Sequence, residues 1–406
     1  MIANIWLTSA LWIGLALVAS LISIRIAVSV ALVEIMVGAI GGNLLGMTAN
    51  DWVSYLAGVG AIVLTFLAGT EIDPAVIRRH AGATLSIGLV GFFAPYLGVL
   101  AYAHFVLLWP WPQAQIAAIA LSTTSVAVVY AVMIESGLAM RSLGKTILAA
   151  CFITDLGTVL ALGILFASFD SMLVLFAIAT GIALAVMPRL TGWLVARVPG
   201  RVSEPEIKLI LVVLFGLGAL ATEAGSEAVL PAYLVGLAVA GVFVADRVLV
   251  HRMRATAFSL LTPFYFLKAG SLIAFPAIAA GAGLIALFLV VKVGAKVIGV
   301  WPAARALGLA TRDANYTTLL MSTGLTFGTI AALYGLTNGL IDQATYTILV
   351  TVVILSAVVP TLIATTFFEP QPATGEAFED FEAAEEIDSG PLLLPPHAAP
   401  ADLRAR

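Results

Sequence analysis

The chain has 406 residues, of which 61% are hydrophobic and 10% charged, with a formal net charge of -4 and a mean hydropathy of +1.09. Repeated apolar stretches of about 18 or more residues exclude a soluble domain and indicate a polytopic membrane protein. A single cysteine, Cys151, excludes an intramolecular disulfide, and no CxxC motif or Cys/His cluster indicates a metal site. The charge balance gives no indication of nucleic-acid binding.

Hydropathy and the charged breaks divide the chain into thirteen predicted membrane helices. The first, Ile5 to Ile24, lacks a basic n-region and a small-residue cleavage site, so we interpret it as a membrane helix and not as a signal peptide. The predicted spans are 5–24, 29–46, 53–70, 81–108, 113–135, 144–169, 171–188, 206–222, 228–245, 255–275, 278–304, 313–335 and 342–367.

The charges between these helices predict an orientation. Fourteen lysines and arginines fall in alternate predicted loops, whereas the loops on the other side carry only acids. The fourteen are Arg25, Arg78, Arg79, Arg141, Lys145, Arg189, Arg197, Arg201, Lys208, Arg247, Arg252, Arg254, Arg305 and Arg312. The positive-inside rule then places the N-terminus outside the cell (inner) membrane and the C-terminus in the cytoplasm.

Thirteen helices can be divided into six, one linking helix and six. The single linker inverts the second set relative to the first, which is the architecture of inverted-repeat transporters. Polar residues interrupt the fifth helix at Ser122–Ser125 and the twelfth at Ser322–Thr326, which contains Thr323 and Gly324. Matching interruptions in the two halves point to a binding site. The alternative is that Ser, Thr and Gly only help membrane helices to pack closely.

Asp155 is the only charged residue in the run of 24 from Thr146 to Phe169. A carboxylate at this depth costs on the order of 2.5–3.5 kcal/mol, so it normally faces a cavity and marks an ion or proton path. It would bind either a proton or a metal cation. Hydroxyls of Thr124, Ser125 and Thr154, with carbonyls freed by the helix break, would complete an oxygen shell for Na+ or K+. The alternative is an aspartate that only hydrogen-bonds across the bundle.

Three lysines also fall within predicted helices. Lys292 and Lys296 are four residues apart and share one face of the helix predicted at 278–304, far from either end. Lys268 lies in the helix predicted at 255–275. The functional interpretation makes Lys292 and Lys296 core lysines of the transport site, and the alternative is snorkelling to the membrane interface.

Four further acids, Glu34, Glu71, Asp73 and Glu135, lie near predicted helix ends, and we interpret them as solvated. The chain's charge changes sign along its length. Residues 1–368 carry 17 basic and 14 acidic side chains, whereas residues 369–406 carry two and nine. The latter also lack an apolar period, so we predict a transmembrane domain at 1–368 and a disordered acidic cytoplasmic tail at 369–406.

Five segments together resemble the monovalent cation:proton antiporter superfamily, specifically its bacterial sodium/proton and potassium/proton exchanger branch. They are Phe66–Asp73, Thr123–Val129, Ile153–Gly157, Pro263–Gly270 and Lys292–Gly299. Their order and spacing span most of residues 1–368, which would make this part a transmembrane sodium/hydrogen exchanger domain. The resemblance implies the sodium/proton antiporter fold, an all-α membrane protein of two inverted six-helix repeats.

The resemblance also implies a homodimer with a rigid dimerisation part and a mobile core, in which two unwound helices cross. These correspond to the fifth and twelfth predicted helices. Asp155 matches the family's cation-binding aspartate, Thr124 and Ser125 match its polar break, and Lys296 matches its core lysine. Elevator-like displacement of the core is then expected, with Na+ or K+ and H+ as substrates in a lipid bilayer, and without a cofactor.

Thr154 departs from the family pattern. Electrogenic members have two adjacent acids here, electroneutral members commonly have Asn-Asp, and potassium-type members have Gln-Asp. This chain has Thr154-Asp155. Because threonine does not ionise, we predict electroneutral exchange, with about one proton per cation. The first alternative function is a carrier of related fold that couples Na+ to an anion or organic solute, which Lys296 would bind. An intramembrane enzyme is disfavoured because Asp155 is the only deep aspartate and no HExxH occurs.

Overall fold

The protein is all-helical in a computed structural model, whose described residues are 5–26, 29–71, 81–136, 138, 141–166, 171–197 and 203–370. No strand occurs within these ranges. Aspartate 73 and nearly all of the tail predicted at 369–406 lie outside them.

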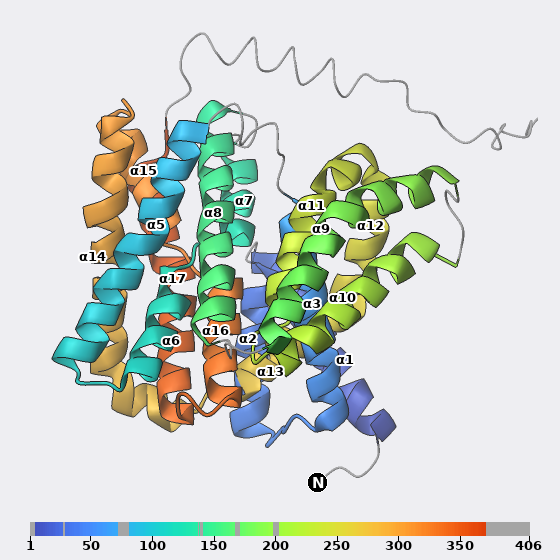
Figure 1. The fold of residues 1–406 in the computed structure, drawn as a ribbon. Helices are drawn as coiled ribbons and strands as arrows, with labels where there is room; N and C mark the ends of the chain where they lie inside the picture. Colours follow the sequence, from blue (N-terminus) through green and yellow to red (C-terminus); the bar gives the residue numbers. More distant parts are fainter. Residues whose placement is uncertain are drawn as a thin grey trace, which may run out of the picture. The chain divides into compact units, whose positions relative to one another are not determined.

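Figure 1 shows the helices, whose bounds follow the hydrophobic segments of the sequence. The first half contains α1 (Ile5–Ile26), α2 (Val30–Leu44), α3 (Asp51–Thr70), α5 (Ala81–Ala101), α6 (Trp111–Ser122), α7 (Val126–Glu135) and α8 (Ser142–Leu165). The rest contains α9 (Ser171–Arg197), α10 (Pro205–Glu223), α11 (Val229–Ala245), α12 (Arg247–Thr256), α13 (Thr262–Ser271), α14 (Phe275–Ala306), α15 (Thr311–Met321), α16 (Thr326–Thr337) and α17 (Gln343–Phe367).

Every one of the thirteen predicted spans overlaps a helix or a pair of helices. Within the described residues, ten segments are long and apolar enough to cross a membrane, and α2 and α11 are shorter apolar helices. The remaining span, predicted at 255–275, is built from α12, a π-helical turn at Ala257–Leu261, and α13. The all-α, multi-pass architecture predicted from the sequence is therefore confirmed.

Several predicted boundaries were wrong. Helix α9 was expected to end at residue 188 but continues through Pro188 to Arg197, so Arg189 and Arg197 lie on a helix and not in a loop. A proline removes one backbone hydrogen bond, and a membrane helix tolerates that loss. The segment around Arg252 is also helical: α12 begins at Arg247, where Asp246 caps it by accepting a hydrogen bond from the Leu249 amide at 3.0 Å.

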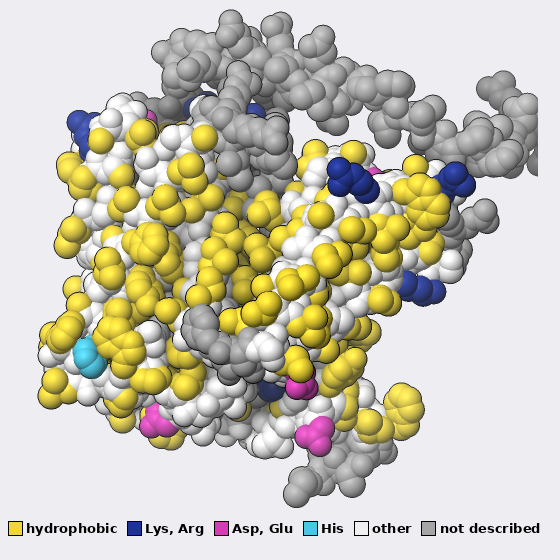
Figure 2. All heavy atoms as spheres, viewed as in Figure 1, with side chains coloured by type: hydrophobic (Ala, Val, Ile, Leu, Met, Phe, Trp, Pro, Cys, Tyr) yellow, Lys and Arg dark blue, Asp and Glu magenta, His cyan; other side chains and the backbone are white. Residues whose placement is uncertain are grey.

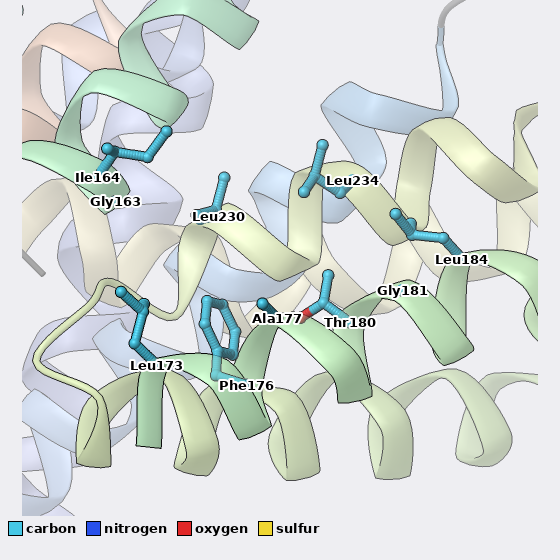
Figure 3. Close-up of a pocket in the computed structure, with 10 residues that line it drawn as sticks. All are labelled: Gly163, Ile164, Leu173, Phe176, Ala177, Thr180, Gly181, Leu184, Leu230 and Leu234. Carbon is cyan, nitrogen blue, oxygen red and sulfur yellow. The ribbon is translucent and has the colours of Figure 1, made fainter. Parts of the chain in front are cut away.

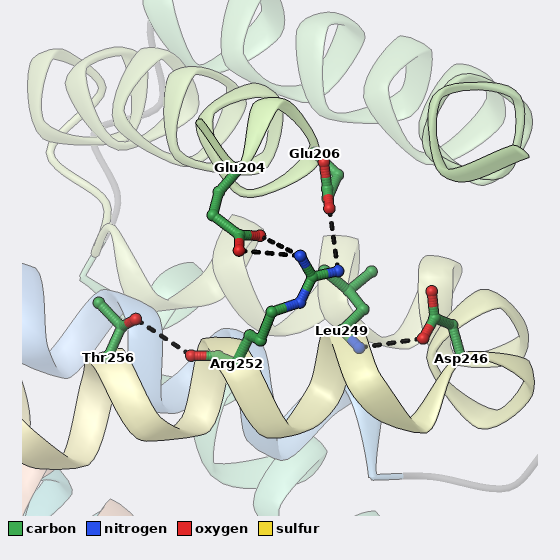
Figure 4. A network of polar contacts seen from close by, with 6 residues as sticks. All are labelled: Glu204, Glu206, Asp246, Leu249, Arg252 and Thr256. Carbon is green, nitrogen blue, oxygen red and sulfur yellow. Dashed lines mark hydrogen bonds and ion pairs between the residues drawn. The ribbon is translucent and has the colours of Figure 1, made fainter. Parts of the chain in front are cut away.

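Helix α12 is fixed to α10 by the ionic network in Figure 4. The Arg252 guanidinium donates to Glu204 at 2.8 Å and to Glu206 at 3.1 Å. The Glu206 side chain is 2% exposed, so Arg252 compensates a buried carboxylate. Two residues later on α12, Arg254 pairs at 2.6 Å with Glu71, the residue after the end of α3. These basic residues therefore hold helices together in addition to contributing to the loop charge pattern.

The helices form two bundles (Figure 1). In the scaffold bundle, α3 packs against α11 and α13, α2 packs against α1 and α13, and α9 packs against α10 and α11. In the core bundle, α5 packs against α6, α8 and α14, and α17 packs against α14, α15 and α16. Along the chain, three scaffold spans are followed by three core spans, and after α9 this order is repeated. The two predicted six-helix repeats thus each contribute to both bundles.

Glycines allow the scaffold helices to pack backbone against backbone. A Cβ atom at Gly236 of α11 would collide with the Phe66 carbonyl of α3, and one at Gly69 of α3 would collide with the Tyr233 carbonyl of α11. Close helix approach through small residues is typical of membrane bundles. The surface is in keeping with this packing, because hydrophobic side chains are spread over both bundles on the face drawn in Figure 2. The scaffold is therefore tightly packed inside and apolar outside.

Candidate functional site

The fifth predicted span is broken where the sequence becomes polar. Helix α6 ends at Ser122, α7 begins at Val126, and Thr123–Ser125 between them are not helical. Thr123, Thr124 and Ser125 are 0%, 1% and 3% exposed, so this break is completely enclosed. Buried helix ends leave backbone groups without helical partners, which must bind side chains or ligands.

The twelfth predicted span is broken in the same way, between α15 and α16 at residues 322–325. The two breaks contact each other. The Thr124 hydroxyl donates to the Met321 carbonyl at the end of α15 at 2.9 Å, and the Ser125 amide donates to the Thr323 hydroxyl at 3.3 Å. Gly328 on α16 has no side chain, and a Cβ atom there would meet the Ala120 carbonyl of α6. Two interrupted helices about 200 residues apart in sequence therefore meet at their interruptions.

Asp155 lies on the uninterrupted helix α8 and faces the first break. Its carboxylate is 2% exposed and accepts a hydrogen bond from the Thr123 hydroxyl, at 3.0 Å from Oδ1. The ion pairs formed among the described residues are Arg252 with Glu204 and Glu206, and Arg254 with Glu71, so Asp155 has no ion-pair partner there. A buried carboxylate without a fixed cation can be neutralised by a proton or by a bound cation.

Lys296 reaches the same break from α14. It is 0% exposed, and its ammonium donates to the Thr124 hydroxyl at 2.9 Å. Thr124 in turn donates to Met321, so a chain of two hydrogen bonds joins α14, the first break and the end of α15. A cation close to the C-terminal end of a half-helix is electrostatically favourable.

Lys292, one turn earlier on α14, reaches the second break. It is also 0% exposed, and its ammonium donates to the Ser356 hydroxyl of α17 at 2.8 Å. Gly324 leaves the room for it, because a Cβ atom there would collide with the Lys292 Nζ atom. Each buried lysine thus lies at a different break. Snorkelling would bring the ammonium groups to the membrane interface, and the complete burial of both side chains rules it out. Lys268 is only partly buried and lies on α13 in the scaffold bundle.

Most of the residues predicted for the site come together, but Thr154 does not. Its hydroxyl donates to the Cys151 carbonyl of its own helix at 2.7 Å, and its methyl carbon lies near Gly91 of α5. Two hydroxyls that the sequence did not single out do take part, Thr123 on Asp155 and Ser356 on Lys292. Thr123 lies in the predicted polar run Ser122–Ser125, which contains four hydroxyls. Only the three-dimensional structure shows that the Thr123 hydroxyl is the one that binds the Asp155 carboxylate.

Glu34 corrects a different expectation. It was interpreted as a solvated residue near a helix end, yet it is 2% exposed within α2. Its Oε2 atom has no hydrogen-bond partner among the described residues. The position one turn from the helix start suggested solvent, but α13 and α1 pack against α2. Glu71 at the end of α3 is partly exposed and ion-paired, as expected for an end position, and the side chain of Glu135 lies outside what the structure describes.

A separate cavity of about 400 Å³ lies beside α8, α9 and α11 (Figure 3). Its lining comes from leucine, isoleucine, phenylalanine and other small or apolar residues, with Thr180 as the polar exception. None of the described residues that line the cavity is charged, so these residues are unsuited to bind an inorganic ion. The oxygen-rich cluster around Asp155 remains the candidate ion site.

Comparison with known proteins identifies the family. The family model described as sodium/hydrogen exchanger, transmembrane, matches residues 13–369. The chain belongs to this family. Members of this family are cation/proton antiporters, the class of protein that the sequence predicted. The chain is accordingly a multi-pass membrane transporter and not an enzyme.

Individual relatives agree with this assignment. The Na(+)/H(+)-K(+) antiporter GerN of Bacillus cereus is 26% identical over 363 residues, which cover 85% of this chain and 92% of GerN. The glutathione-regulated potassium-efflux system protein KefC of Salmonella schwarzengrund is 24% identical over 94% of this chain and 63% of its own length. The solved structure of the sodium proton antiporter MjNhaP1 from Methanocaldococcus jannaschii shares the fold, with a TM-score of 0.69 at 16% identity, covering 89% of this chain and 98% of that chain.

Proposed function

We propose that the chain exchanges a monovalent cation, Na+ or K+, for H+, and that Asp155 binds the cation and the proton in competition. The observation that carries this proposal is the placement of the buried Asp155 carboxylate against the meeting point of two broken helices, with no ion-pair partner among the residues that the structure describes. Cation and proton each neutralise the carboxylate, and the two compete for the same oxygen atoms. Competition for one site is sufficient to couple the two fluxes.

The cation's ligands are proposed from the oxygens around Asp155. The hydroxyls of Thr123, Thr124 and Ser125, with backbone carbonyls freed at the helix ends, supply the hard oxygen donors that alkali cations prefer. Thr323 and Gly324 form the facing part of the second break. Thr154 is a weaker ligand candidate because its hydroxyl already donates within α8.

We propose that exchange is electroneutral. One carboxylate lies at the site, its preceding residue Thr154 does not ionise, and Lys296 donates to a hydroxyl and not to an acid. Lys296 and Lys292 then act as fixed cations that stabilise the ends of the half-helices at the two breaks. One proton therefore replaces one monovalent cation in each cycle.

We propose that transport occurs by an elevator-like displacement of the core bundle along the scaffold bundle. Asp155, the Thr123 hydroxyl that binds it, Lys296 and both helix breaks belong to the core bundle, so the site would move as a unit. Moving a charged carboxylate along the apolar contact between the two bundles is costly. The core bundle is therefore expected to move only when Asp155 has bound a proton or a cation. We further propose a homodimer formed through the scaffold bundle, in a cell (inner) membrane with the N-terminus outside and the C-terminus in the cytoplasm, following the loop charges.

The test is cation-induced pH change in proteoliposomes loaded with a pH-sensitive dye. Wild type, Asp155→Asn and Asp51→Asn are each challenged with Na+, K+ and Li+. Asp51 is an exposed aspartate at the start of α3, so its variant controls for the loss of an aspartate elsewhere. We expect wild type and Asp51→Asn to respond to the transported cation and Asp155→Asn to lose the response. Folded wild-type protein that responds to none of the three cations would refute the proposal.

A further inference from the structure

The seam between the two bundles is formed mainly by α8 of the core and α11 of the scaffold. Ser226, Leu230 and Tyr233 are among the scaffold residues that contact α8 along it. The Ser226 hydroxyl, just before α11, donates to the Gly163 carbonyl at 2.9 Å. Leu230 packs against Gly163, where a Cβ atom would collide with it. The Tyr233 hydroxyl donates to the Phe152 carbonyl at 3.0 Å.

Tyr233 is anchored rigidly on the scaffold side. A Cβ atom at Gly69 of α3 would collide with the Tyr233 carbonyl, and one turn later Gly236 lies against the Phe66 carbonyl. Direct backbone packing at two successive turns leaves α11 little freedom to shift against α3. The Tyr233 side chain, 0% exposed, therefore projects from a fixed point.

On the core side, Tyr233 contacts two of the helices that contribute to the candidate ion site, α8 and α16. Its hydroxyl binds the carbonyl of Phe152, three residues and about one turn before Asp155 on α8. Its ring packs edge-on against Phe327 of α16, with ring centroids 5.8 Å apart and an interplanar angle of 83°. Among the described residues, its hydrogen bond goes to the helix backbone and not to the Asp155 carboxylate.

We propose that Tyr233 is a positioning residue that sets the depth of Asp155 relative to the scaffold bundle in the state seen here. The proposal rests on the elevator mechanism proposed above. For α8 to slide along α11, the Tyr233 hydroxyl has to leave the Phe152 carbonyl. The next carbonyl on that face of α8 is one turn, about 5.4 Å, away. The bond therefore defines one register of α8 against α11. Packed helices that slide past each other move between discrete registers of this kind.

The Ser226 bond acts in the same direction at the end of α8. It joins the bundles at the Gly163 end, which the proposed orientation places outside. The state seen here is then closed on the outside and would open toward the cytoplasm. Removing either hydroxyl should destabilise this state relative to the outward-open one. A buried neutral hydrogen bond of ordinary strength corresponds to a shift of about fivefold in the ratio of the two states.

The experiment compares Tyr233→Phe with Tyr265→Phe. The substitution at 233 removes one oxygen and keeps the ring against Phe327. Tyr265, on α13 of the scaffold, is equally buried, and its hydroxyl has no hydrogen-bond partner among the described residues, which makes it a matched control. Apparent KM for the transported cation is measured from each side of oriented proteoliposomes at several pH values, together with the maximal rate.

We expect Tyr233→Phe to raise the cytoplasmic KM and lower the external KM, so that the ratio of the two constants rises about fivefold, while Tyr265→Phe leaves both unchanged. Ser226→Ala should shift both constants in the same directions as Tyr233→Phe, and this second variant serves if Tyr233→Phe fails to fold. A purely structural role would reduce the amount of folded protein without moving the two constants apart, and that result would overturn the proposal. If wild type itself shows no exchange, the proposed function is wrong. If wild type exchanges but Tyr233→Phe shows no shift in the two constants, only the proposed role of Tyr233 is wrong.

Discussion

Lys296 and Asp155 contact adjacent residues of the first helix break and do not form an ion pair with each other. The Lys296 ammonium donates to Thr124 at 2.9 Å, whereas the Asp155 carboxylate accepts from Thr123 at 3.0 Å. The lysine is thereby tied to the helix ends, and the carboxylate remains available to a substrate ion. The two neighbouring threonines are therefore expected to have separable roles.

Thr123→Val and Thr124→Val should have different consequences. Thr123→Val removes the hydroxyl that binds Asp155, and we expect the apparent KM for the cation to rise about tenfold, because hydrogen bonds to charged groups are worth roughly 1.5–3 kcal/mol. Thr124→Val leaves the buried Lys296 ammonium without its acceptor, so the free energy of unfolding should fall by about 1–3 kcal/mol. Cation titrations at fixed pH and thermal unfolding in detergent measure the two effects. The same KM change in both variants, with no difference in stability, would contradict this division.

Electroneutral exchange predicts that the rate is insensitive to membrane potential. Exchange is driven by a Na+ gradient in potassium-free proteoliposomes, or by a K+ gradient in sodium-free ones. The membrane potential is clamped at about 0 and -100 mV, and the initial rates of exchange at the two potentials are compared. Moving one net charge per cycle would add about 2.3 kcal/mol of driving force per 100 mV, which is readily measured. We expect no difference between the two potentials. A rate that follows the potential would show that a second proton or charge moves with Asp155.

Gly324→Ala should disrupt the second break. The added methyl group would meet the Lys292 ammonium, which is held between Gly324 and Ser356. Overpacking a filled interior costs about 1–3 kcal/mol, so we expect a corresponding loss of stability and a reduced transport rate. Gly294→Ala on α14 is the control, because nothing lies within 4 Å of the added atom there.

A second variant identifies the cause of the Gly324→Ala defect. Lys292→Ala shortens the opposing side chain, so Gly324→Ala should cost less in a Lys292→Ala background than in wild type. The double-mutant cycle, measured by thermal unfolding, gives this coupling. Simple additivity of the two substitutions would mean that the methyl group clashes with something else.

The sequence predicted the elements of this fold well because membrane helices have a strong hydropathy signal. The thirteen spans, the interruptions at Ser122–Ser125 and Ser322–Thr326, and the isolated Asp155 could all be read from residue types. A membrane excludes most alternative backbone conformations, so long apolar segments determine helices almost directly. Helix ends were less predictable, as in α9, where the charged break at Arg189 predicted an end that the structure does not have.

Side-chain partners in the site could be predicted only in part. Adjacent hydroxyls at Thr123 and Thr124 have the same chemistry, and helix crossing alone decides that one meets Asp155 and the other Lys296. Ser356 on α17 gave no signal, because an isolated serine in a membrane helix is common in helix packing. Glu34 was misjudged because position near a helix end does not reveal which neighbouring helix covers it.

Arg252→Met should destabilise the protein more than Arg254→Met, although the two arginines lie on the same helix, α12. Arg252 bonds to Glu204 and to the buried Glu206, and its loss leaves the Glu206 carboxylate buried without a cation. We expect the free energy of unfolding to fall by about 1–3 kcal/mol, the cost of an uncompensated buried polar group. Arg254 pairs with Glu71, with side chains that are 44% and 36% exposed, so its loss should cost no more than about 1 kcal/mol.

Thermal unfolding in detergent at two chloride concentrations separates these cases. Salt screens an exposed ion pair much more than a buried one. The Arg254→Met difference from wild type should therefore shrink at high salt, while most of the Arg252→Met difference should persist. Adding Glu206→Gln to Arg252→Met removes the buried charge and should restore part of the lost stability. Equal losses for the two arginine variants, or no recovery with Glu206→Gln, would show that burial of Glu206 is not what makes Arg252 important.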